Sequence, residues 1–262
     1  MLIAMDYPYF CYRTPMPPEI FVKKVVTAYQ NSQGIFTNKV NAEELTPVNA
    51  DEWQKACYLF YVIQIDYAIK SQRLYQGALR LFNSDPSFFD PKYQITLKEN
   101  KLRKYFLDYL KPRYINEAVK RYCVNSSTLV ALYHSDPRII FKLGSTAEEV
   151  LSLIRKFRGF GPKIGNFFVR TMINSFNYEY ADIDRMLPPV DIHDVRIAYL
   201  LGFLDSSDMS QRNICATKEL WSEACKQAGV SWLIFDKALW LLGSEGKPKS
   251  GEDVKKLIDS TY

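Results

Sequence analysis

Apolar residues recur along most of the chain three or four positions apart, the spacing that gathers them on one face of an α-helix. After Asp51, for example, Ala56, Leu59, Phe60 and Ile63 follow this spacing. Alternation of apolar and polar residues, the pattern of a half-buried strand, is almost absent. The pattern therefore predicts an all-α fold of roughly ten or more helices.

The ends of the predicted helices carry capping signals. Asp51 is a good N-cap residue, Pro162 suits the first turn of a helix, and Ser145–Glu149 places acids where the helix dipole favours them. Asn83–Pro86 is predicted to end a helix, residues 1–18 to be irregular, and 31–49 to be a polar connection. Eight helices are predicted over 19–30, 52–67, 72–82, 98–110, 116–133, 192–204, 217–228 and 234–242, and three more begin near 138, 145 and 162.

Composition and charge fit a globular chain long enough for one large domain or two small ones. Of the 262 residues, 47% are apolar and 24% are charged, which is typical of a folded protein rather than a disordered one. The 34 basic and 29 acidic residues leave a formal net charge of +5. This surplus is compatible with a polyanionic partner but is too small to demonstrate one.

Neither a membrane span nor a metal cluster is indicated. The longest apolar run, Ala56–Ile69, is short for a bilayer span and contains Gln64 and Asp66. The five cysteines are scattered without a C-x-x-C motif, so neither a zinc site nor a four-cysteine iron–sulfur cluster is signalled. The N-terminus lacks the features of a signal peptide. We therefore expect an intracellular, cytoplasmic protein that needs no metal and no organic cofactor.

One stretch, Phe157–Leu204, contains the candidate chemistry. It begins with a glycine-rich turn in which Gly159 and Gly161 permit positive φ angles and a close approach of backbone N–H groups to a ligand. The helix that opens at Pro162 then presents unpaired N–H groups, which suit a phosphate. A tight helix–helix turn that needs glycine for steric reasons alone explains the same residues.

Two charged residues lie at helix openings within this stretch. Lys163 falls in the first turn after the hairpin, where the positive end of the dipole disfavours a protonated amine, as a nucleophilic lysine requires. Asp191 precedes an apolar helix and suits an N-cap, a position that also fixes a carboxylate. Taken singly, Lys163 is equally an exposed solvated side chain, Asp191 a simple cap, and His193 either a phosphate contact or a surface residue.

The segments Gly159–Lys163 (GFGPK) and Pro189–His193 (PVDIH) together resemble the signature of the helix-hairpin-helix-Gly/Pro-Asp DNA glycosylases. The resemblance implies that Lys163 is a Schiff-base lysine and Asp191 the catalytic aspartate. It also implies two helical subdomains with a helix-hairpin-helix motif and the lesion site in the cleft between them. Residues 50–165 form the first subdomain, and residues 1–49 with 166–262 form the second. Asn177–Arg185 looks like an insertion between the two catalytic positions.

Within that superfamily, residues 150–245 are most similar to the archaeal 8-oxoguanine DNA glycosylases. The similarity implies that Asp236 and Trp240 line the pocket for the oxidised base and that Phe167 stacks on it. The hairpin is of the glycine-rich superfamily form rather than that family's atypical version.

The implied activity is excision of 8-oxoguanine or a related oxidised purine, followed by β-elimination at the abasic site. The expected partner is double-stranded DNA containing a damaged base, bound by a monomer that is nucleoid-associated in a prokaryote and has no membrane contact. The alternatives are a glycosylase for another damaged or mispaired base and a non-catalytic helix-hairpin-helix DNA-binding protein. The expected DNA contacts are Arg158, Gly159, Gly161, Gly165, His193 and Gln64, with further sequence-independent affinity from Lys156 and Arg170.

Overall fold

The computed structural model describes residues 16–259, and every regular element among them is a helix. The predicted all-α fold is therefore confirmed. The irregular stretch predicted for residues 1–18 lies almost entirely outside the described residues. The α-helices are α1 Pro18–Gln30, α2 Glu52–Ile63, α3 Ser71–Ser84, α4 Pro91–Gln94, α5 Glu99–Tyr105, α6 Ile115–Tyr133, α7 Arg138–Leu143, α8 Ala147–Ile154, α9 Pro162–Phe176, α10 Ile192–Leu200, α11 Gln211–Ala228, α12 Trp232–Ser244 and α13 Gly251–Asp259.

Several helix boundaries differ from the predicted ones. The helix expected over 192–204 ends at Leu200, because the chain turns at Gly202 with a φ of +82°. The stretch predicted as a helix over 98–110 divides into α5 and a π-helical turn, Phe106–Leu110, which ends where Lys111 adopts a left-handed conformation. Two short elements, α4 and α13, were not predicted, because few apolar residues mark them.

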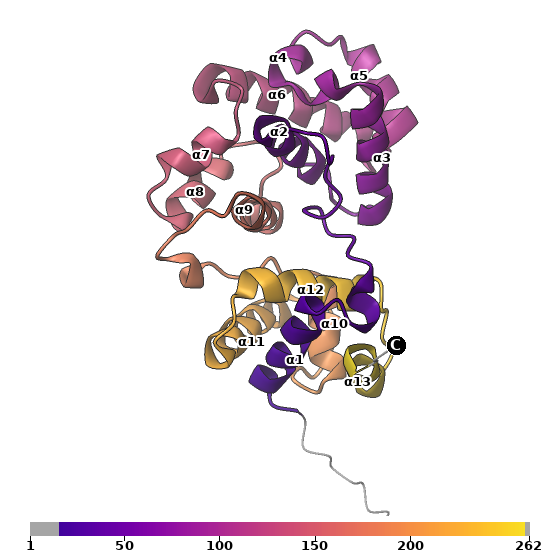
Figure 1. The fold of residues 1–262 in the computed structure, drawn as a ribbon, viewed down its shortest axis with the longest axis vertical. Helices are drawn as coiled ribbons and strands as arrows, with labels where there is room; N and C mark the ends of the chain where they lie inside the picture. Colours follow the sequence, from indigo (N-terminus) through magenta and orange to yellow (C-terminus); the bar gives the residue numbers. More distant parts are fainter. Residues whose placement is uncertain (1–15, 260–262) are drawn as a thin grey trace, which may run out of the picture.

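The helices form two groups in space. Figure 1 shows α2 to α9 in one group and α1 with α10 to α13 in the other. The first helix, α1, packs against α11 and α12, so the chain starts in the second group, passes to the first and then returns. Helix α9, which follows the glycine hairpin, packs against α2 and α8. The predicted subdomain boundaries at residues 49 and 165 stay a prediction.

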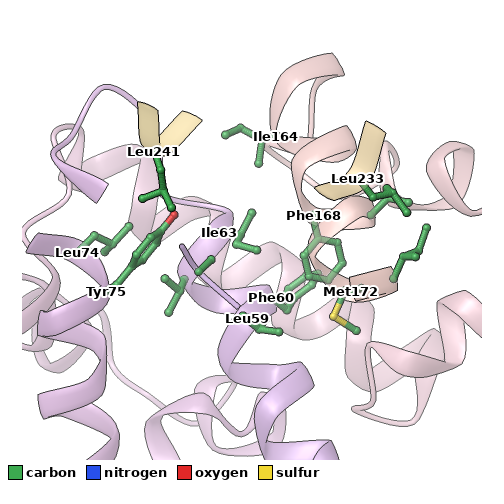
Figure 2. Packing of buried hydrophobic residues seen from close by; sticks show 14 of the residues in the cluster. Leu59, Phe60, Ile63, Leu74, Tyr75, Ile164, Phe168, Met172, Leu233 and Leu241 are labelled. Carbon is green, nitrogen blue, oxygen red and sulfur yellow. The ribbon is translucent and has the colours of Figure 1, made fainter. Parts of the chain in front are cut away.

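Aromatic side chains of the hairpin pack in the centre of the first group of helices. Phe60 on α2 is completely buried, and its ring centroid lies 5.2 Å from that of Phe157, 5.1 Å from that of Phe160 and 5.6 Å from that of Phe168. Figure 2 shows Phe60 and Phe168 in this packing, with Met172 beside them. Because Phe157 and Phe160 belong to the hairpin and Phe168 to α9, burial of one ring sets the position of the whole motif.

None of the helices between Met16 and Asp259 combines the length and the continuous apolar character that crossing a bilayer requires.

Replacement of Phe60 by alanine should lower the free energy of unfolding by about 3–5 kcal/mol, because it leaves a cavity among three other rings. Chemical denaturation followed by circular dichroism measures the loss. Leu132→Ala is the matched control, since that side chain is 65% exposed and its removal opens no cavity. Equal losses in the two variants would contradict the central position of Phe60.

Candidate active site

The glycines of the hairpin serve different purposes. Gly159 has a φ of +89°, which L side chains rarely adopt, so the backbone conformation requires glycine; a Cβ atom there would also displace the Arg121 side chain, which lies 2.6 Å away. A Cβ atom on Gly165 would lie 3.2 Å from the carbonyl oxygen of Phe160, because α9 packs closely on the hairpin. A Cβ atom on Gly161 would meet nothing within 4 Å. The steric explanation therefore covers Gly159 and Gly165 but not Gly161.

A buried amide holds the hairpin in place. The Asn125 side chain donates to the carbonyl oxygen of Arg158 at 2.9 Å and accepts from the Arg158 N–H at 2.8 Å. The same amide nitrogen donates to Oε1 of Gln64 at 2.8 Å. Gln64 has no exposed surface, so this side chain orients Asn125 and, in this structure, has no atom available to a DNA ligand. The sequence alone does not distinguish a buried glutamine at a helix end from an exposed glutamine that contacts DNA.

Arg158 lies on the outer side of the hairpin. Its guanidinium group is half-exposed and forms an ion pair with Glu117 of α6, at 2.9 Å. This pairing leaves the Arg158 side chain at the surface but partly compensates its positive charge.

The two predicted catalytic residues lie together although 28 positions separate them. Nζ of Lys163 is 3.3 Å from Oδ2 of Asp191. Asp191 is also the N-cap of α10, because its Oδ1 accepts the backbone N–H of His193 at 2.7 Å. The Lys163 side chain is 49% exposed and that of Asp191 only 12%. A fixed, largely buried carboxylate therefore lies beside an amine that solvent and ligands can reach.

The pair opens into a cavity between the two groups of helices, with a volume of about 70 Å³ accessible to water. Five of the predicted site residues line it, namely Lys163, Asp191, Phe167, Asp236 and Trp240. The remaining lining residues are Asn41, Ala42, Asp66, Ser71, Tyr75, Ile164, Arg170, Pro189 and Asp194. The walls thus combine aromatic rings with several carboxyl groups, and both groups of helices contribute to them.

His193 is not among the residues that line this cavity. It is half-buried on α10, and its Cβ atom packs closely against Gly243 of α12. Burial lowers the pKa of His193, and the nearby Arg196 acts in the same direction, while the charge of Asp191 opposes them. Its backbone N–H contributes to the site by fixing Asp191.

The expectation that Arg170 adds affinity for DNA phosphates is wrong. Its side chain is only 3% exposed and pairs with Asp236 on α12 and with Glu43, at 3.0 Å from the latter. The guanidinium group also lies over the ring of Phe167, 4.8 Å from its centroid. Positions 163, 167 and 170 lie on one face of a helix. This spacing is a signal in the sequence that predicts Arg170 in the pocket beside Lys163 and Phe167.

Sequence reasoning also missed Asp66 and Asp194. Asp66 accepts hydrogen bonds from the hydroxyl groups of Tyr75 and Ser71, and burial raises its pKa. The only signal for Asp66 was a carboxylate inside an otherwise apolar run. Asp194 follows Asp191 by three positions, which is the spacing of a capping box.

The segment Asn177–Arg185, between Lys163 and Asp191, is held by hydrogen bonds to other elements. Asp182 accepts the backbone N–H groups of Ala147 at 2.8 Å and Glu148 at 3.2 Å, and so caps α8 from a distant segment. The indole of Trp232 donates to the carbonyl oxygen of Ile183 at 3.0 Å. These bonds fix the segment that carries the chain from α9 to Asp191.

The described part of the chain contains no recognisable metal-binding site. Between residues 16 and 259, no group of three or more His, Cys, Asp or Glu side chains is arranged to hold a metal ion.

Comparison with known proteins gives one kind of match. No protein-family model and no curated protein sequence matches the chain. Among solved structures, a thermostable thymine-DNA glycosylase matches over 90% of both chains with a TM-score of 0.54 and 12% sequence identity. The chain has a DNA glycosylase fold. The predicted glycosylase-like architecture is thereby confirmed, whereas identity this low carries no statement about the substrate.

The pocket carboxylate Asp236 should make stability depend on pH. Burial raises the pKa of Asp236 from 3.8 to about 6, although Arg170 opposes the shift. Between these values the native protein keeps a proton that the unfolded chain has released, so stability falls as pH rises. We expect the free energy of unfolding of the wild type to decline between about pH 4 and about pH 6 relative to Asp236→Asn. Denaturant titrations across this range measure the difference, and parallel curves for the two proteins would contradict it.

Proposed function

We propose that this protein is a base-excision DNA glycosylase in which Lys163 is the nucleophile and Asp191 its charged partner. The observation that carries the proposal is the 3.3 Å contact between Nζ of Lys163 and Oδ2 of Asp191 at the wall of the cavity. The DNA glycosylase fold supports it. A protein that only binds DNA needs neither an accessible amine nor a buried carboxylate at this place.

The hairpin and the start of α9 are proposed to bind a DNA phosphate. The first backbone N–H groups of a helix lack intrahelical partners, and their positive dipole end favours an anion. Gly161 leaves open space beside them, so a phosphate can approach the backbone. Arg158 and Lys156 lie exposed near the hairpin and would add affinity that weakens with salt.

The cavity is proposed to hold a nucleotide extruded from the duplex. Extrusion costs a few kcal/mol and costs least for a damaged or mispaired base. Phe167 from α9 and Trp240 from α12 are half-buried aromatic residues of the cavity wall and would stack on the base. This arrangement agrees with a lesion site in the cleft between two helical subdomains.

Excision would then proceed by nucleophilic substitution at the sugar. The neutral amine of Lys163 attacks C1′, the N-glycosidic bond breaks, and the base leaves with its bonding electrons and takes up a proton. The carboxylate of Asp191 stabilises the positive charge that develops on the sugar. Opening of the sugar ring gives a Schiff base, from which β-elimination expels the 3′ phosphate.

The hydrogen-bonding character of the cavity favours an oxidised guanine as the substrate. Asp66 and Asp236 line the cavity, and carboxyl oxygens accept hydrogen bonds. Guanine offers N–H donors at N1 and N2, and oxidation at C8 adds a third at N7. Thymine offers one N–H donor and two carbonyl acceptors, so it matches this wall less well. A mispaired thymine is the second candidate, because the solved structure with this fold is a thymine-DNA glycosylase.

Borohydride trapping tests the nucleophile. On a duplex that contains 8-oxoguanine, the wild type should form a covalent adduct that Lys163→Gln does not form. Base release by that variant should be slower by about a hundredfold or more. Asp191→Asn should slow release by about a hundred- to a thousandfold, because the developing charge loses its partner.

Lys156→Gln is the matched control, since it removes the same charge from an exposed lysine close to the hairpin. An undiminished adduct in Lys163→Gln would refute the assignment of Lys163. Base release without any adduct in the wild type would leave Lys163 a DNA contact and remove the β-elimination step. Tight binding without product on any substrate would support the non-catalytic alternative.

Substrate preference is measured by single-turnover excision on matched duplexes containing 8-oxoguanine, a mispaired thymine or a normal guanine. We expect faster release of 8-oxoguanine than of thymine, by about tenfold or more, since unmatched hydrogen-bonding groups cost about 1–3 kcal/mol each. Asp236→Asn should reduce this preference. Faster release of thymine would favour the second candidate and leave the proposed nucleophile intact.

A further inference from the structure

Asp194 occupies an unusual position next to Asp191. It lies in the first turn of α10, is only 3% exposed and lines the cavity. Its Oδ2 accepts the backbone N–H of Asp191 at 2.6 Å. Its Oδ1 is buried and meets no hydrogen-bond donor within the described part of the chain. Capping of α10 explains Oδ2 but not the isolated Oδ1.

The carboxyl groups of the cavity differ in the donors that they receive. Asp191 has three, the backbone N–H groups of His193 and Asp194 and the ammonium group of Lys163, and Asp236 has the guanidinium group of Arg170. Asp194 has one neutral donor. A buried carboxylate with so little compensation is costly, and the usual remedy is to take up a proton.

The surrounding charges act in the same direction. Asp191 at the start of α10 and Asp236 on α12 are both negative neighbours of Asp194, and the positive Lys163 on α9 opposes them. Burial, followed by the charges of Asp191 and Asp236, raises the pKa of Asp194 well above its usual value. Two carboxyl groups whose environments differ this strongly assume different protonation states.

We propose that Asp194 is a positioning residue that remains protonated at neutral pH, holds Asp191 through its backbone N–H, and leaves Asp191 as the single negative charge beside Lys163. Its contribution to excision rests on the proposed function. A second charge at Asp194 would stabilise the protonated, non-nucleophilic form of Lys163. The neutral carboxyl group thus fixes the catalytic carboxylate without adding to the charge of the site.

The protonation state is measured without any substrate. Aspartate labelled with ¹³C at its side-chain carboxyl group gives one NMR resonance per residue, and the resonance that disappears in Asp194→Asn belongs to Asp194. At pH 7 we expect its chemical shift to be that of a neutral acid, and to move to that of a carboxylate only on alkaline titration. The shift of an ionised carboxylate at pH 7 would overturn the proposal, whether or not the protein excises bases.

The effect on excision is measured by single-turnover rates as a function of pH. Asn is neutral and retains an oxygen for the N–H of Asp191, so Asp194→Asn should stay within about tenfold of the wild type at pH 7. Asp194→Ala frees Asp191 and should be slower by about a hundredfold. The ratio of the Asp194→Asn rate to the wild-type rate should rise with pH across the alkaline range in which the Asp194 resonance titrates, because only the wild type gains the second charge.

Asp253→Asn is the control, since Asp253 accepts backbone N–H groups at the start of α13 and does not line the cavity. Its pH profile should be that of the wild type. A constant rate ratio for Asp194→Asn would indicate a purely structural cap and overturn the proposal. Absence of excision on every duplex would refute the proposed function, and the NMR titration would still decide the state of Asp194.

Discussion

The contact between Lys163 and Asp191 is the constraint that the rest of the structure serves. The two residues lie at the starts of different helices, and an amine and a carboxylate at 3.3 Å need both helix ends to be fixed. On the lysine side, Phe60 packs against the aromatic rings of the hairpin, and the Asn125 side chain forms hydrogen bonds with the hairpin backbone. On the aspartate side, the capping interactions of α10 fix the carboxylate.

The wall of the cavity next to this pair contains buried charged side chains that compensate one another, and it is not simply apolar. Arg170 is buried between Asp236 and Glu43, and through them it connects α9 to α12 and to the segment before α2. Removal of one member of such a group leaves an uncompensated buried charge, which is far more costly than the group as a whole. The same residues therefore hold the two groups of helices together and determine the hydrogen-bonding character of the cavity wall.

The sequence predicted helix starts well where apolar periodicity and caps coincide, as for α2 after Asp51 and α9 at Pro162, whereas α2 ends at Ile63 rather than near residue 67. It brought Lys163 and Asp191 together only through a resemblance, because no local pattern records a contact across 28 positions. Gln64 and Arg170 show the limit in the other direction. Gln64 is the C-cap of α2 and Arg170 lies on α9, and only packing decides that the first supports the hairpin and the second lies buried in the cavity wall. The unpaired oxygen of Asp194 likewise has no counterpart in a sequence pattern.

The bond from Asp182 to the start of α8 has a consequence for how the chain folds. Thr146 caps one N–H of α8, but the N–H groups of Ala147 and Glu148 are capped by a residue that follows α9, 35 positions after Ala147. The start of α8 therefore lacks two of its capping hydrogen bonds until α9 and the segment that contains Asp182 are in place. The hairpin and its two flanking helices should consequently form and open as one cooperative unit, which emerges from the ribosome only after Asp182 has been synthesised.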